Sequence, residues 1–89
     1  MAEAGSRRRA QTAFVPLSVI IEIDVPRLLP QLVAGLKAAD CRAVPISSRA
    51  CRVVHRQAES LSVAMLELRF FAQAWALAHG DVSVDLRPA

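Results

Sequence analysis

The sequence predicts one small α+β domain whose elements follow the order strand, helix, strand, strand, helix, strand. Apolar and polar residues alternate in the first and last of these segments, which is the pattern of half-buried strands. In two longer segments apolar residues recur every three or four positions, which is typical of amphipathic helices. The chain has 89 residues, enough for one domain only. We expect this domain over residues 12–89 and a disordered basic tail over residues 1–11.

The first strand is predicted over residues 13–23, which are rich in β-branched side chains. Asp24 follows and is expected to cap the next helix by accepting free N–H groups of the first turn. That helix should run to about Asp40. Pro26 lies in its first turn, where the missing N–H is tolerated, and Pro30 is early enough to do no more than make that turn irregular.

Residues 41–46 and 50–56 are predicted to be two short strands joined by a serine-containing turn. Pro45 places the first of them at an edge of the sheet, because proline lacks the N–H that a central strand needs. Cys41 and Cys51 would not lie opposite each other in this hairpin. We therefore expect reduced, partly buried thiols, as in a cytoplasmic protein.

The second helix is predicted to begin at Gln57 or Ala58 and to end before Gly80, a residue type that often ends helices in the left-handed conformation. The final strand follows it. Its alternating apolar residues are Val82, Val84 and Leu86.

Right-handed crossovers would fold these elements into a four-stranded antiparallel sheet of order 4-1-3-2 with both helices on one face, the ferredoxin-like arrangement. On the helix-free face, Glu22 and Asp85 would neighbour Arg52 and Arg56 and form ion pairs with them. The residues expected between the sheet and the helices are Val19, Ile21, Ile23, Val53, Val82, Val84, Leu32, Leu36, Leu68 and Trp75.

The long second helix carries two apolar stripes on opposite sides, whereas one thin sheet can cover only one of them. The stripe expected to face the sheet is Leu61, Met65, Leu68, Phe71 or Ala72, and Trp75. The second stripe is Val63, Leu66, Phe70, Ala74 and Leu77. Because a helix that is apolar on both sides is normally buried on both sides, we expect the second stripe to contact another copy of the chain or another protein.

The whole chain has a net charge of +3, and its basic residues are concentrated in the first half. They offer a possible contact with nucleic-acid phosphates through Arg7, Arg8, Arg9, Arg52 and Arg56. Ferredoxin-like RNA-binding domains stack bases on aromatic residues of the two central strands. The predicted central strands contain only Phe14, so nucleic-acid binding is kept as an alternative.

No residue pattern points to catalysis, a metal or a cofactor. Ser47 and Ser48 lie in a predicted turn with no histidine expected nearby, and the two histidines and two cysteines lack metal-ligand spacing. We therefore expect a non-enzymatic protein without a cofactor. Glu67 and Arg69 lie at the centre of the only apolar segment of membrane-spanning length, which argues against a membrane helix.

The segment Ile21-Glu22-Ile23-Asp24-Val25-Pro26-Arg27-Leu28-Leu29 resembles the start of ACT domains, which are small βαββαβ regulatory modules. The likeness continues through Gln31-Leu32-Val33 and Ile46-Ser47-Ser48-Arg49. ACT domains bind an amino acid in the loop after the first strand, at a subunit interface. The resemblance therefore implies a ligand site at Asp24, Val25, Pro26, Arg27 and Leu28. Arg27 stands where that family has glycine, which removes a close approach of the backbone to a ligand.

Together these patterns predict a small cytoplasmic association or regulatory module. It would homodimerise or dock a protein partner through the second stripe of the long helix. The alternatives are an amino-acid-binding regulatory domain and a nucleic-acid-binding accessory domain.

Overall fold

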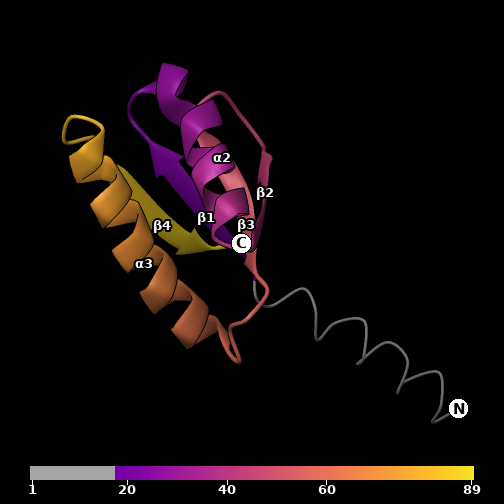
Figure 1. The fold of residues 1–89 in the computed structure, drawn as a ribbon. Helices are drawn as coiled ribbons and strands as arrows, with labels where there is room; N and C mark the ends of the chain where they lie inside the picture. The colour runs from indigo at the N-terminus through magenta and orange to yellow at the C-terminus, as the bar shows by residue number, and fades with distance from the viewer. Residues whose placement is uncertain (1–17) are drawn as a thin grey trace, which may run out of the picture.

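The computed structural model describes residues 18–89, and Figure 1 shows how their helices and strands are arranged. The elements are β1 (Ser18–Ile23), the 3-10 turn η1 (Pro26–Leu28), α2 (Leu29–Ala38), β2 (Cys41–Pro45), β3 (Ala50–His55), α3 (Leu61–Ala78) and β4 (Val84–Pro88). The predicted tail over residues 1–11, the predicted start of the first strand, and Arg7, Arg8 and Arg9 lie outside the described residues.

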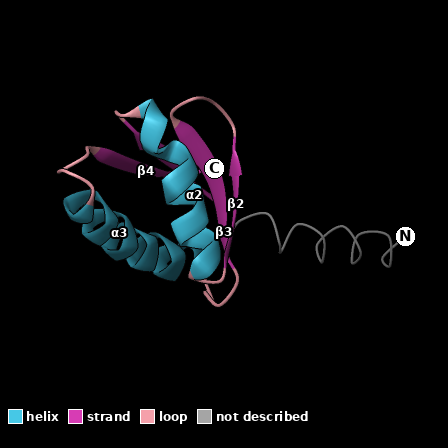
Figure 2. Cartoon of the chain, turned by 45° about the horizontal axis from the view of Figure 1, so that its top comes forward, coloured by secondary structure: helices cyan, strands magenta, loops and turns pink. Residues whose placement is uncertain are grey.

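The four strands form one antiparallel sheet with the order β2-β3-β1-β4, which reads 4-1-3-2 from the β4 edge. Figure 2 shows both helices on the same side of this sheet. Helix α2 contacts β2 and β3, and α3 contacts β4 and β1. The predicted α+β class, with a four-stranded antiparallel sheet and two helices, is therefore confirmed.

The hydrophobic core lies between the sheet and the helices. Val19, Ile21 and Val53 of the central strands form one buried cluster with Leu32 and Leu36 of α2. All ten residues predicted to fill this layer are buried, except Val84, which is half-buried. Full burial of one such aliphatic side chain contributes about 1.5–3 kcal/mol, so this layer holds the helices on the sheet.

Asp24 does not cap a helix, and the prediction that it would is wrong. Its Oδ1 accepts a hydrogen bond from the Ser83 N–H at 3.0 Å, and its own N–H donates to the Ser83 carbonyl at 3.3 Å. The carboxylate is used instead to fasten the end of β1 to the residue before β4. Val25 stands at the N-cap position of η1 without a side-chain cap. The irregular first turn expected from Pro30 is confirmed, because η1 precedes the regular turns of α2.

Helix α3 begins later than predicted, at Leu61 rather than at Gln57 or Ala58. Ser60 is its N-cap, with Oγ accepting a hydrogen bond from the Val63 N–H at 3.2 Å. The helix ends at Ala78, and Gly80 follows with a φ of 93°, as expected for a helix-ending glycine. The last strand begins at Val84, two residues after its predicted start.

On the helix-free face of the sheet, the prediction that Arg52 and Arg56 pair with Glu22 and Asp85 is wrong, because a different arginine does so. Glu22 lies directly opposite Asp85 in the β1–β4 register, which brings two negative charges together. Arg87, two residues along β4 on the same face, places its Nη1 3.0 Å from the Glu22 carboxylate and 3.6 Å from that of Asp85. Arg52 lies opposite Ile20, and Arg56 follows the end of β3. Hence Arg87, rather than Arg52 or Arg56, compensates the two carboxylates.

Candidate functional site

The second apolar stripe of α3 is exposed on the described chain. Its members share the side of the helix that points away from the sheet, because successive residues are turned by about 100°. We call them the outer stripe. They are Val63, Leu66, Phe70 and Leu77, which are 37%, 54%, 64% and 72% exposed, and the exposed Ala74.

The opposite side of α3 already covers its share of the sheet. Leu68 and Trp75 are buried there, as predicted, and they are accompanied by the buried alanines Ala64, Ala72 and Ala76. Small side chains at these positions let the helix lie close to the strands. The outer stripe is therefore not needed to cover the sheet.

Side-chain contacts join α3 to β3 and stabilise the C-terminal end of the helix. Glu67 pairs with the Nε2 of His55 on β3. The backbone N–H of Gln57 donates to the Nδ1 of the same ring at 3.2 Å, so both ring nitrogens of His55 have a partner. At the other end, His79 stacks on Trp75 with ring centroids 4.4 Å apart, and its Nδ1 donates to the Trp75 carbonyl at 2.8 Å. The Glu67–His55 pair therefore anchors α3 to β3, and the contacts of His79 with Trp75 stabilise the C-terminal end of the helix.

The outer stripe is comparable in area with the largest exposed apolar patch of a typical monomer. Its exposed fractions correspond to about 400 Å² of apolar area, within the roughly 300–600 Å² of the largest patch on a typical monomer. Patches of this size often mark binding sites.

Among residues 18–89, α3 is the one helix that is long and apolar enough to cross a membrane, judged by length and composition alone. In the fold, however, Glu67 at its centre pairs with β3 and its inner side packs on the sheet. Within this part of the chain, α3 serves as one of the two helices of the α+β domain.

In the part of the chain that the structure describes, three of the five residues that the ACT resemblance implies as a ligand site are divided between two pockets. Val25 and Leu28 pack against the edge of the core. Pro26 and Arg27 border a groove beside β2, whereas Asp24 lines a pocket on the β4 side of the domain. The sequence could not show this division, since Asp24 is drawn to Ser83, 59 positions along the chain.

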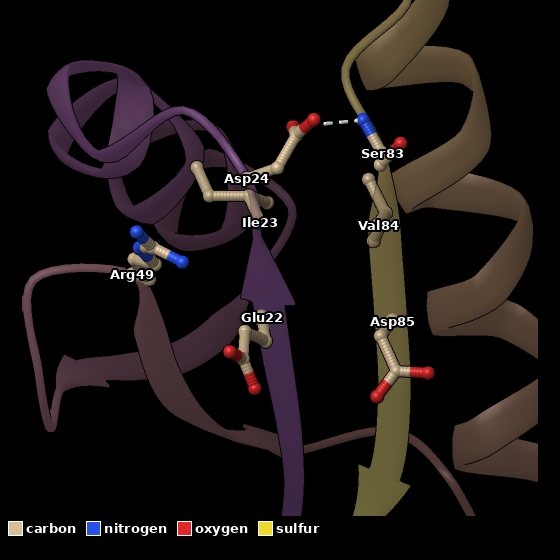
Figure 3. Close-up of a pocket in the computed structure, with 7 residues that line it drawn as sticks. All are labelled: Glu22, Ile23, Asp24, Arg49, Ser83, Val84 and Asp85. Atoms are coloured by element: carbon tan, nitrogen blue, oxygen red, sulfur yellow. Dashed lines mark hydrogen bonds between the residues drawn. The ribbon is translucent and has the colours of Figure 1, made fainter.

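The pocket that contains Asp24 has a volume of about 220 Å³. Figure 3 shows Asp24 reaching across to Ser83, with the guanidinium of Arg49 on the other side of β1. All three carboxylates of the pocket have partners inside the domain, since Asp24 accepts the Ser83 N–H and Arg87 pairs with both Glu22 and Asp85. Its full lining is Glu22, Ile23, Asp24, Arg49, Ser83, Val84 and Asp85.

The two cysteines are free and buried, as predicted. Register pairs Cys41 with His55 and Cys51 with Pro45, so the two thiols are not opposite each other. Burial raises the pKa of Cys51 to about 11. Burial, followed by the charges of Asp40 and Glu67, also raises the pKa of Cys41. Both groups are therefore protonated at neutral pH, which is unsuited to a nucleophile.

The residues predicted to contact nucleic acid are only partly covered by the structure. Arg52 and Arg56 are exposed, and the three N-terminal arginines lie outside the described range. Over residues 18–89 there is no cluster of three histidine, cysteine or acidic side chains arranged to hold a metal ion.

Comparisons of the chain with protein-family models, with curated proteins and with solved structures found no significant match.

Proposed function

We propose that this protein is a non-enzymatic association module of the ferredoxin-like type, which homodimerises through the outer stripe of α3. The exposure of Leu66, Phe70 and Leu77 on an anchored helix carries the proposal. Two free, buried cysteines support a location in the reducing cytoplasm.

The outer stripe is suited to meeting a copy of itself. A two-fold interface is isologous, so each residue of the stripe must find room on the same stripe of the partner. Phe70, the bulkiest member, is followed one helical turn later by Ala74. In a crossed pair of α3 helices, the small side chain of Ala74 leaves space for the partner's aromatic ring.

The energetics of the outer stripe allow a dimer. Removing about 400 Å² of apolar surface from water on each copy contributes about 10 kcal/mol per copy at 25 cal/mol/Å². Association opposes this with roughly 4–15 kcal/mol of lost translational and rotational freedom. The apolar contribution of the two copies exceeds this cost, which supports the proposed dimer.

The test is sedimentation equilibrium of the purified chain at tens of micromolar. We expect the wild type to be a dimer and the double variant Leu66→Asp, Phe70→Asp to be a monomer with an unchanged circular dichroism spectrum. The matched control is Val44→Asp, Ile46→Asp, because these two residues are 52% and 47% exposed on and just after β2. The control should remain dimeric. A monomeric wild type, or equal dissociation of the control, would overturn the proposal.

A further inference from the structure

Among residues 18–89, no further strand pairs with the outer side of β2. Strand order places β2 at one end of the sheet, and Figure 1 shows none of the labelled elements outside it. The Ile46 N–H donates inward to the Ala50 carbonyl at 2.9 Å. Because backbone groups alternate in direction along an antiparallel strand, Ala43 and Pro45 direct theirs outward. Pro45 has no N–H, but the Ala43 N–H and the Ala43 and Pro45 carbonyls have no strand partner within the described residues 18–89 and can pair with another strand.

An apolar groove runs along the helix side of this edge. Its volume is about 610 Å³. The floor is provided mainly by proline, leucine and valine side chains, whereas Arg27 and Lys37 add two positive charges. The lining residues are Pro26, Arg27, Leu29, Pro30, Val33, Lys37, Pro45 and Ser48.

The other side of the same edge is also cationic. Arg42 and Val44 of β2 are exposed on the helix-free face, and register places Arg52 of β3 directly beside Val44. From Val25 to Arg56 the chain has six arginine or lysine residues and a single acidic residue, Asp40. Asp40 is occupied by a 2.9 Å hydrogen bond from the Gln57 Nε2.

We propose that the open edge of β2 binds an extended acidic peptide segment as an additional strand. Alternate side chains of such a strand point to opposite faces. One set, apolar, would enter the groove, and the other set, acidic, would meet Arg42 and Arg52. Backbone hydrogen bonds would supply affinity and the two flanks specificity.

Charge and groove chemistry select this occupant over two others. A second copy of the chain paired at the same edge would bring Arg42 and its neighbours against like charges, which destabilise cross-strand pairs. Nucleic acid would match the charge, but the groove offers prolines and aliphatic side chains rather than the aromatic platforms on which bases stack.

The binding test uses a fluorescein-labelled, N-acetylated octapeptide of alternating glutamate and valine and measures its anisotropy with the full chain. We expect saturable binding and a shift of the Ala43 amide resonance in a spectrum of the ¹⁵N-labelled protein. Arg42→Glu should weaken binding about tenfold, because one attraction becomes a repulsion. Arg69→Glu is the matched control, since it makes the same charge change on α3, which packs over the opposite edge, and should leave binding unchanged.

Two further probes separate strand pairing from attraction between charges. A peptide N-methylated at alternate backbone nitrogens keeps its side chains but cannot pair as a strand, so its binding should be lost. An oligodeoxythymidine of equal length should bind more weakly than the peptide. Tighter binding of the oligonucleotide, unchanged binding of the methylated peptide, or no binding of the original peptide would each overturn the proposal.

Discussion

Cys51 shows how strongly one residue is affected by its position in the core. Its side chain is fully buried on the central strand β3, where a thiolate would lose its hydration without gaining a cationic partner. Burial therefore raises its pKa to about 11 from an ordinary value of 9.0. The unfolded chain, by contrast, releases this proton near the ordinary value.

This difference predicts a loss of stability in alkaline solution. Since the pKa is higher in the folded state, stability is complete below pH 9.0 and falls as the pH rises through about 11. The free energy of unfolding, from urea titrations over this range, should fall by of order 2 kcal/mol. The chain has one lysine and no tyrosine, so few other groups titrate there. In Cys51→Ala the fall should be much smaller, with the remainder due to Cys41. A stability that is flat with pH in the wild type would contradict this account.

Residue-scale contacts between distant segments were the features least accessible from the sequence. Asp24 is a residue type that often caps helices and it precedes one, but in the fold its carboxylate accepts the Ser83 N–H. Strand order alone predicts Arg52 as the partner of Glu22, because β3 lies next to β1. The choice of Arg87 depends on the β1–β4 register, which sets Glu22 opposite Asp85.

At the scale of the element, the start of α3 depends on one hydroxyl group. The sequence predicts a start at Gln57 or Ala58, whereas the helix begins at Leu61, where Ser60 can accept the Val63 N–H. Periodicity in a window of many residues identified the helix and its two stripes, because both depend on spacing. It could not locate the end, because capping is a property of a single residue in an extended conformation.

The role of this cap can be tested by two serine substitutions. Ser60→Ala should lower the free energy of unfolding by about 1 kcal/mol, because the Val63 N–H loses its acceptor. Ser62→Ala lies inside the first turn at an exposed position and should be neutral or slightly stabilising, since alanine favours helix. Chemical denaturation of both variants makes the comparison. Equal losses in the two would show that Ser60 does not act as a cap.

At the scale of the whole molecule, the sequence predicts both the four-stranded antiparallel sheet with two helices and the helix with two apolar stripes. The fold follows from the order of periodic segments and the handedness of their crossovers. The exposure of Phe70 and Leu77 follows from an excess of apolar helix surface over the sheet available to cover it. The sequence does not predict the groove beside β2, because that groove combines residues from η1, α2, β2 and the hairpin loop.

The proposed dimer has a consequence for thermal unfolding. Association stabilises the folded state by mass action, so the melting temperature should rise with protein concentration. The dependence should be insensitive to salt, because the outer stripe is apolar and screening acts on charges. Differential scanning calorimetry over a hundredfold concentration range measures it. Leu66→Asp, Phe70→Asp should melt at a temperature independent of concentration, and Val44→Asp, Ile46→Asp should behave like the wild type.

Helix α3 lies over β4, and β2 forms the far edge of the sheet. Pairing through α3 would leave both copies of that far edge uncovered, so the assembly would be bivalent. A ligand carrying two acidic strands on a linker long enough to span them would gain avidity from the second engagement, by a factor set by effective concentration rather than by any new contact. The same separation would let the pair act as a clamp that joins two different chains.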